Sequence, residues 1–183
     1  MSNTANVSAG KPKIGGAIYR APLGTTLPTS VEAVLNEAFV CLGYVSDAGL
    51  VNANTATSTA IKAWGGDTVL DVQTDKPDTY QFTLLEVLDP NVLKAVYGDS
   101  NVSGTLETGI TVNANSTEQT DCCWVVDMIM RNDAKKRIVI PAGKVTAVGN
   151  ITYSDSAAVG YDTTVSCHPD TAGNTHYEYI KAS

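Results

Sequence analysis

Few residues of this chain could act as a nucleophile or a general base. The candidates are four cysteines and two histidines: Cys41, Cys122, Cys123, Cys167, His168 and His176. Cys167 and His168 are neighbours, but adjacent side chains of a strand point to opposite faces of a sheet. We therefore do not expect a cysteine–histidine catalytic pair.

Other groups of polar side chains also fall short of a recognisable site. His168, Asp170 and His176 could supply three metal ligands, yet both histidines lie near a turn, and surface histidines are the simpler interpretation. Gly10-Lys11 and Gly143-Lys144 lack the earlier glycine and the following Ser or Thr of a phosphate-binding loop. The sequence predicts no enzyme activity, no metal site and no cofactor.

The charge balance argues against tight binding of nucleic acid. The chain has 19 acidic and 12 basic residues, a net charge of −7, and its one basic run covers residues 135–137. Affinity for DNA or RNA depends on cations that neutralise phosphates, and such cations are scarce here. An acidic protein can still lie beside DNA if its role is to let the DNA slide past.

Cysteine usage and hydropathy suggest where the chain is made. The cysteines have no CxxC spacing and the first residues do not have the pattern of a secretory signal, so we expect no such signal and free thiols in a protein synthesised in a cytoplasm. No apolar run is long enough to cross a bilayer, and no membrane partner is expected.

The clearest local structure is a short helix over residues 90–97. Asp89 can cap its first turn, Pro90 suits the first helical position, and Gly98 can take a left-handed conformation just beyond the end. Leu93 and its apolar neighbours share one face. Because so short a helix is unstable alone in water, it must pack on the surrounding strands.

The residues before this helix predict strands and tight turns. Alternating apolar and polar residues predict a half-buried strand over 78–86. Residues 68–73 are expected to pair with that strand through a turn at 74–78. The run Trp64-Gly65-Gly66-Asp67 predicts a tight reversal, since both glycines can take positive φ.

Strands at regular spacing, separated by turns, predict one mainly β domain over residues 1–183. We expect an antiparallel sandwich or partial barrel with one short flanking helix, a long projecting loop over 46–76 and an extended, flexible N-terminal arm over 1–13. A brief second helix is expected over 31–38. The other expected strands are 14–21, 39–45, 109–113, 122–131 (the longest), 136–140 (ended by Pro141), 144–153, 162–167 and 176–180.

Several short segments resemble one known family. They are Ala63 to Asp67, Phe82 to Glu86, Asn91 to Gly98, Leu42 to Gly49, Tyr153 to Asp155 and Pro169 to Gly173. Together they are similar to the major tail tube protein of long, flexible-tailed (siphovirus-type) bacteriophages, and the resemblance covers most of the chain.

This resemblance implies a structural protein of the phage virion, located in the tail and assembled in the host cytoplasm. Subunits would form hexameric rings with their sheets joined edge to edge, and the rings would stack into a tube whose acidic lining lets genome DNA pass. The partners would be further copies of the chain, the tape measure protein, and the tail terminator and tip proteins. The helix over 90–97 would brace the sheet from outside.

Contacts between subunits and between rings are expected from the arm and the projecting loop. The candidate residues are Lys11, Lys13, Trp64, Gly65, Gly66 and Asp67. The two lysines carry the opposite sign to the acidic body of the chain, and interface energy concentrates in large aromatic residues such as tryptophan.

Simpler interpretations of the same features stay open from the residues alone. The arm could be a disordered terminus, the 46–76 loop an ordinary pair of sheet strands, and Trp64 a core residue at a sheet corner. The alternative function is a carbohydrate-binding or adhesive β-sandwich module, which would need a concave patch of aromatic side chains on one sheet face.

Overall fold

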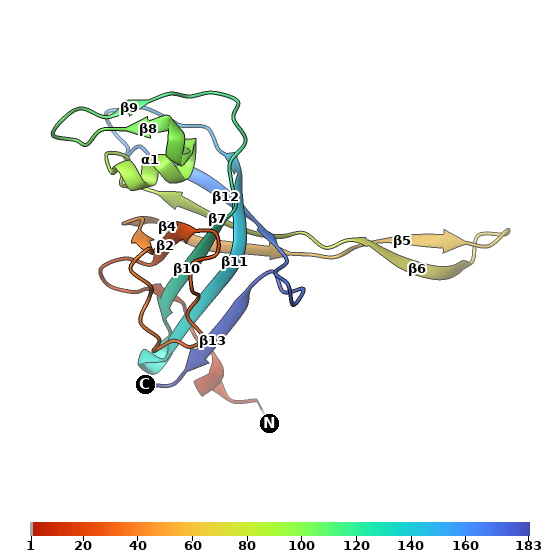
Figure 1. Cartoon of the computed structure of the whole chain (residues 1–183). Helices are drawn as coiled ribbons and strands as arrows, with labels where there is room; N and C mark the ends of the chain where they lie inside the picture. The colour runs from red at the N-terminus through yellow and green to blue at the C-terminus, as the bar shows by residue number, and fades with distance from the viewer. Residues whose placement is uncertain (1) are drawn as a thin grey trace.

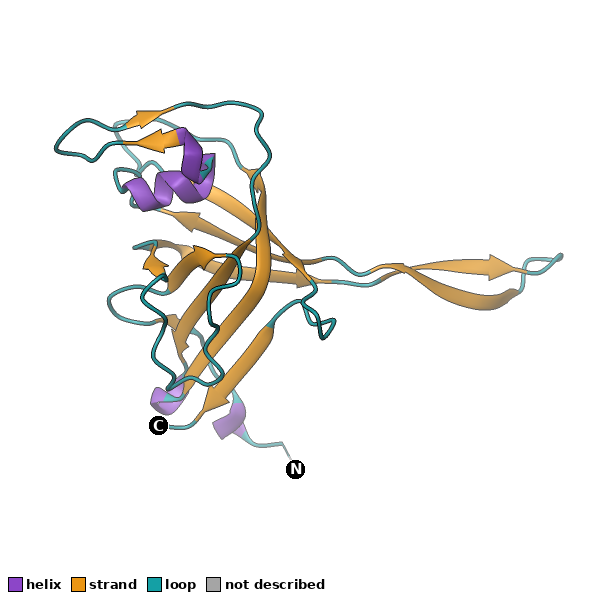
Figure 2. Cartoon of the chain, in the orientation of Figure 1, coloured by secondary structure: helices purple, strands orange, loops and turns teal. Residues whose placement is uncertain are grey.

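The computed structural model describes residues 2–183, and Met1 of the expected arm lies outside them. Within this range the chain forms mainly antiparallel strands and one α-helix (Figures 1 and 2), as predicted. Nine strands belong to one sheet: β1 (Lys11–Pro12), β2 (Ile18–Pro22), β3 (Val40–Cys41), β4 (Val45–Asn54), β7 (Asp78–Leu84), β10 (Cys122–Ile129), β11 (Lys135–Val148), β12 (Tyr161–His168) and β13 (Tyr177–Lys181). Two small pairs complete the strands: β5 (Thr57–Lys62) with β6 (Thr68–Asp75), and β8 (Val102–Ser103) with β9 (Thr111–Val112).

The large sheet curls into a partial barrel. Its order is β3-β2-β10-β11-β12-β7-β4, with β1 also paired to β10 and β13 also paired to β11. Phe82 of β7 lies 6.1 Å from Trp124 of β10, measured between ring centroids, although β11 and β12 separate these strands in the sheet. Residues 40–45 bridge the two margins, because Leu42 N–H donates to Ile18 O and Leu85 N–H donates to Tyr44 O.

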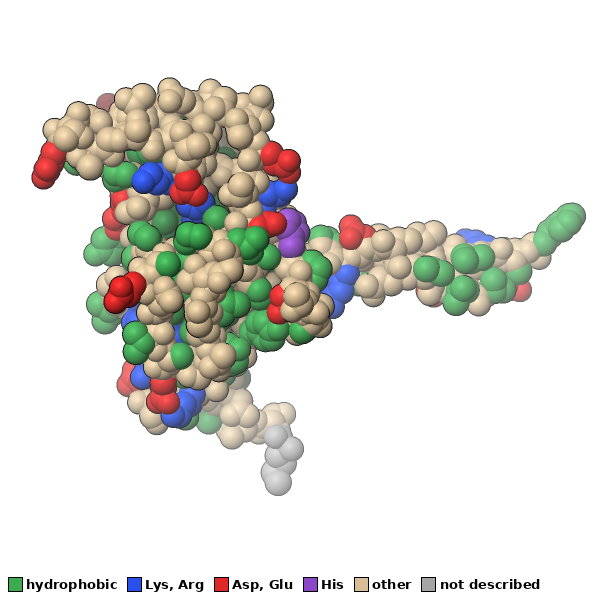
Figure 3. All heavy atoms as spheres, viewed as in Figure 1, with side chains coloured by type: hydrophobic (Ala, Val, Ile, Leu, Met, Phe, Trp, Pro, Cys, Tyr) green, Lys and Arg blue, Asp and Glu red, His purple; other side chains and the backbone are tan. Residues whose placement is uncertain are grey.

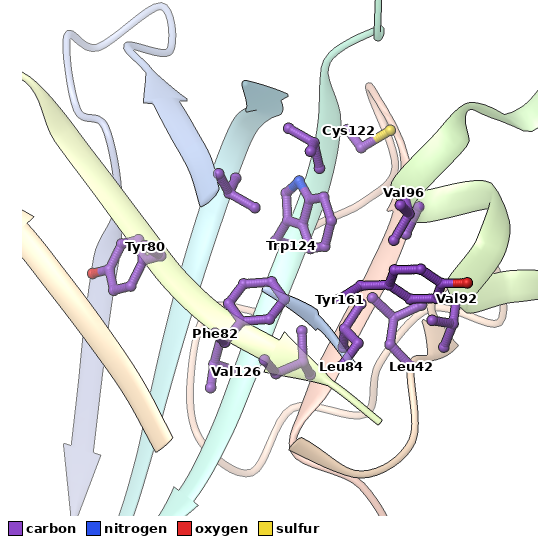
Figure 4. Close-up of a cluster of buried hydrophobic side chains, with 14 of the residues drawn as sticks. Leu42, Tyr80, Phe82, Leu84, Val92, Val96, Cys122, Trp124, Val126 and Tyr161 are labelled. Carbon is purple, nitrogen blue, oxygen red and sulfur yellow. The ribbon is translucent and has the colours of Figure 1, made fainter. Parts of the chain in front are cut away.

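The main core fills the inside of this curl (Figure 4). Trp124 is 1% exposed, and its indole Nε1 donates to Gly143 O at 2.9 Å. A Cβ on Gly143 would lie 3.0 Å from the Trp124 ring and 2.9 Å from Val165, so only glycine fits beside the indole. Cys123 points to the opposite face from Cys122, into a second cluster under residues 23–39. Both faces of β10 are thus covered.

Helix α1 (Pro90–Tyr97) forms where it was predicted and covers one opening of the barrel. The Asp89 carboxylate accepts the N–H of Asn91 at 2.8 Å, and Gly98 ends the helix at a φ of 99°. The buried face of the helix consists of Val92, Leu93, Ala95 and Val96. Figure 4 shows Val92 and Val96 beside Leu42 and Tyr161, which explains how so short a helix is stabilised.

The helix expected over 31–38 is not formed, and the prediction was wrong. The Ser30 hydroxyl does accept the N–H of Ala33, but the segment is a series of bends with Val34 93% exposed. Arg137 provides the reason. Its guanidinium donates to the carbonyls of Ser30 and Ala33, which a helix would need for its own hydrogen bonds.

Strand β11 differs most from expectation. It has 14 residues and is the longest strand, whereas the sequence favoured 122–131 and ended the next strand at Pro141. β13 pairs with Lys135–Val139 and β12 pairs with residues 142–148, so Pro141 lies between two partners. Its missing N–H therefore interrupts no ladder of hydrogen bonds on that edge.

Glycines account for three further differences at the sheet margins. The first expected strand begins only at Ile18, after Gly15 and Gly16 take positive φ. The expected 39–45 strand is reduced to two residues, because Gly43 has a φ of 71°. Residues 46–49 do not end a strand. They form an irregularity within β4, with Gly49 at a φ of 76°, before the pairing with β7 resumes.

The Asp127–Arg137 ion pair lies under residues 23–39, and both side chains are under 10% exposed. Arg137→Met would leave the Asp127 carboxylate buried beside Lys13 alone, which lies 3.4 Å away. We expect a loss of about 3 to 5 kcal/mol in the free energy of unfolding, measured by urea denaturation.

Lys136→Met is the matched control, since Lys136 pairs with Glu178 in a partly exposed position on the same strand. It should cost about 1 kcal/mol or less. Equal losses for the two variants would contradict a special role for the buried pair.

Candidate assembly surfaces

The β5–β6 hairpin projects from the barrel as a separate two-stranded ribbon (Figures 1 and 2). β6 pairs with β5 and not with β7, so the pairing expected between 68–73 and 78–86 was wrong. The projecting part is also shorter than the expected 46–76, because β4 belongs to the main sheet up to Asn54. Every residue of β5 and β6 is exposed.

One face of this hairpin is apolar and uncovered. Ile61 lies opposite Leu70, and Thr59 lies opposite Val72, which places all four side chains on the same face. Ile61, Leu70 and Val72 are 47%, 54% and 41% exposed, and Figure 3 shows hydrophobic side chains gathered on the ribbon. An isolated two-stranded hairpin is only marginally stable in water, so this face is suited to a partner.

The tip of the hairpin is the predicted reversal at residues 64–67. Ala63 N–H donates to Asp67 O at 2.8 Å, Gly66 N–H donates to Ala63 O at 3.0 Å, and Gly65 and Gly66 have φ values of 111° and 100°. Trp64 is fully exposed, so its interpretation as a core residue was wrong. Trp64, Gly65, Gly66 and Asp67 therefore form the tip of the hairpin. Lys11 and Lys13 lie in a different segment, the N-terminal arm.

The root of the hairpin is held by a buried carboxylate that sequence reasoning missed. The Asp78 side chain is 2% exposed and accepts hydrogen bonds from Thr175, His176 and Asn52 at 2.6, 2.6 and 2.8 Å. The His176 ring also meets the Tyr80 ring edge-on, with centroids 5.5 Å apart. This histidine is thus largely buried, contrary to the expected surface position, and the network ties the hairpin to the start of β13.

The N-terminal arm runs along the end of β10. Lys11 and Pro12 form β1 opposite Ile129 and Met128, and the Lys13 ammonium lies 3.4 Å from Asp127. Ahead of β1, Ser8 accepts the backbone N–H of Arg131. Lys13 thus has a partner within its own chain, whereas the Lys11 side chain is exposed and forms no ion pair within residues 2–183.

The cysteine side chains are free thiols, and each histidine lies beside a carboxylate. All four cysteines are free, and burial raises the pKa of Cys167 to about 12, so its reactive thiolate is strongly disfavoured. The ring Nδ1 of His168 lies 2.8 Å from Asp121, and His176 is held by Asp78. In residues 2–183, no three His, Cys, Asp or Glu side chains are grouped as metal ligands, and no helix is long and apolar enough to span a bilayer.

Asp78 should make stability depend on pH. Burial alone would raise the pKa of this carboxyl, but hydrogen bonds from Thr175, Asn52 and His176 outweigh burial and hold the pKa below its usual value. A carboxylate with a lowered pKa stabilises the fold above its unfolded pKa of about 4, and this contribution is lost as pH falls through the lower, folded value. Asp78→Asn should therefore cost about 2 kcal/mol at pH 6, and the difference from wild type should shrink below about pH 4.

Thermal unfolding of both proteins between pH 6 and pH 3 measures this difference. Asp71→Asn, on the exposed hairpin, is the control and should follow the wild type throughout. A difference between Asp78→Asn and wild type that stays constant down to pH 3 would show that the Asp78 charge is not what stabilises the hairpin root.

Comparisons with known proteins agree with a structural role. The family model described as "Phage tail tube protein" matches residues 2–183. A search of curated proteins found no match. The matched range includes the curled sheet, the α1 helix and the projecting hairpin. The chain belongs to the phage tail tube protein family, and it is a non-enzymatic, self-assembling structural protein of the virion tail.

Proposed function

We propose that this chain forms hexameric rings that stack into the tail tube of a long, flexible-tailed (siphovirus-type) phage and conduct its genome DNA. The observation that carries the proposal is the exposed hairpin, a long ribbon whose apolar face and tryptophan tip are left uncovered by the described residues 2–183. Such a surface is costly in a monomer and useful in an assembly. The adhesive-module alternative has no comparable supporting feature.

Unpaired strand edges support the closure of a ring. Within residues 2–183, β4 has ten residues and pairs only with β7, while β13 pairs only with β11. Each strand leaves one row of backbone N–H and C=O groups without a strand partner among the described residues. Pairing such edges between neighbouring copies removes them from solvent. If the same rotation relates each copy to the next and the rotations add up to a full turn, the copies form a closed ring.

The outer face of β7 and β12 is suited to line the lumen. Thr79, Gln81 and Thr83 alternate with the buried residues of β7, and Thr164 and Ser166 do the same on the neighbouring strand β12. Asp162, on this face, accepts two hydrogen bonds from Gln81. A hydroxyl-rich face with an acidic group and few cations offers little for DNA phosphates to bind, which suits DNA passage.

The remaining expected contacts involve the hairpin, the N-terminal arm, helix α1 and the other tail proteins. The hairpin with Trp64, Gly65, Gly66 and Asp67 would reach the next ring, and the arm with Lys11 and Lys13 would support the same junction. Helix α1, with Asp89, Pro90, Leu93 and Gly98, would brace the barrel from outside the lumen. The tape measure protein would lie within the tube, and the terminator and tip proteins would end it.

Removing the hairpin tests the stacking role directly. Asn54 and Asp78 face each other in register, so a two-residue Asn-Gly turn can replace residues 55–77 without altering the main sheet. We expect a folded protein that forms rings but no tubes by negative-stain electron microscopy, while the full chain forms tubes of constant diameter. Tubes from the shortened chain would contradict the hairpin's role, and a full chain that stays monomeric at high concentration would contradict tube assembly.

Trp64 gives a spectroscopic readout of assembly. The chain has two tryptophans, and Trp124 is already buried. On assembly, we expect the emission of Trp64 to shift to the blue and its quenching by acrylamide to fall severalfold, because its fully exposed ring becomes covered. The Trp64→Phe variant, which retains only Trp124, should show neither change. An unchanged Trp64 signal in formed tubes would place this residue outside every interface.

A further inference from the structure

An apolar cavity opens between the two margins of the curled sheet. Its volume is about 210 Å³, and its main apolar side chains are Ile18, Leu50, Val126 and Met128. These residues come from β2, β4 and β10, and β1 forms part of the rim. The cavity is smaller than the sites of about 300 to 1,000 Å³ that bind small molecules, and it suits one large side chain.

We propose that this cavity receives Trp64 from the hairpin tip of a second copy of the chain. The inference rests on the proposed stacking of subunits and names the surface that receives the hairpin. Trp64 is the fully exposed tryptophan of the chain, and its ring would exchange water for an apolar lining on entry.

Charge complementarity supports this occupant. Lys11 and Asp47 lie at the cavity, and Lys62 and Asp67 lie on either side of Trp64 in sequence. None of the four side chains forms an ion pair within residues 2–183, although most other cations near the barrel do. A tip with one cation and one anion can therefore meet a rim with one anion and one cation.

The length of the hairpin requires the partner to be another copy. Gly49 lines the cavity and Trp64 follows 15 residues later, on strands that lead away from the barrel. Because β4 and β5 are extended and Figure 1 shows the hairpin leading away from the barrel, a rise of about 3.3 Å per residue places Trp64 tens of ångströms from the cavity. A chain cannot fill its own cavity, and a tip-to-cavity contact joins different patches of two copies. Such head-to-tail contacts propagate along an axis, as a stack of rings requires.

Photo-cross-linking in the assembled full chain tests the pairing. Position 64 carries Trp64→p-benzoylphenylalanine, and these chains are assembled with ¹⁵N-labelled wild-type chains. After irradiation, mass spectrometry should find adducts between position 64 and ¹⁵N-labelled peptides that contain Ile18, Leu50 or Met128. Adducts to other regions of the labelled chain, or to the same chain only, would overturn the proposal.

A variant that fills the cavity provides the second arm. A Cβ on Gly10 would lie 3.6 Å from the Met128 sulfur, an ordinary contact, and Gly10 does not have positive φ. Gly10→Leu should therefore fold, fill the cavity mouth and reduce the cross-link yield at least tenfold, whereas Gly10→Ala should leave most of the yield. Equal yields from the two variants would contradict entry into the cavity.

The receptor cavity and tube assembly can be tested separately. Tubes that form normally but give no adduct to the cavity would overturn the cavity as the receptor and leave tube assembly standing. A wild-type chain that forms neither tubes nor adducts would overturn both. Leu106→Ala, which removes another exposed apolar side chain away from the hairpin, should change neither tubes nor adducts.

Discussion

Strand β11 holds the two halves of the molecule together. It pairs with β10 along one edge, and along the other edge it pairs first with β13 and then with β12. The strands on either side can then curl until Phe82 and Trp124 share one core. Pro141 lies at the change of partner, and Gly143 leaves room for the indole of Trp124 just after it. The curl of the sheet depends on this continuous strand, because three other strands pair with it.

Some side chains find hydrogen-bond, ion-pair or packing partners within the described part of the chain, and others do not. Buried charges are paired: Asp127 with Arg137, and Asp78 with Thr175, His176 and Asn52. The hairpin has the opposite character, with exposed aliphatic side chains, a free tryptophan and unpaired charges at its tip. Because unpaired buried charges are costly while exposed apolar faces cost less, the chain pairs its buried charges within the barrel and leaves apolar and charged side chains exposed on the hairpin. This division suits a self-assembling protein.

Part of the fold and of the assembly surface could be predicted from the residues. The α1 helix, the buried face of β7 and the reversal at 64–67 follow from capping, alternation and positive-φ glycines. The predictions that were wrong concern which distant strand or side chain a segment contacts. Residues 68–75 have the composition of a strand, but nothing local distinguishes β5 from β7 as the partner. The 31–38 segment has a capping serine, yet a distant arginine binds the carbonyls that a helix would use.

The sequence alone determined the local structure, the mainly β class and the family resemblance, because turns, caps and strand alternation depend on residues only a few positions apart. The tertiary structure decided the strand order, the passage of β11 through Pro141 and the burial of Asp78. It also decided that Trp64 lies in solvent and that segments around residues 11, 18, 49 and 126 enclose one cavity. These features join residues tens of positions apart, and the free energy that selects among such pairings comes from burial and hydrogen bonding in the complete fold, which no short stretch of sequence contains.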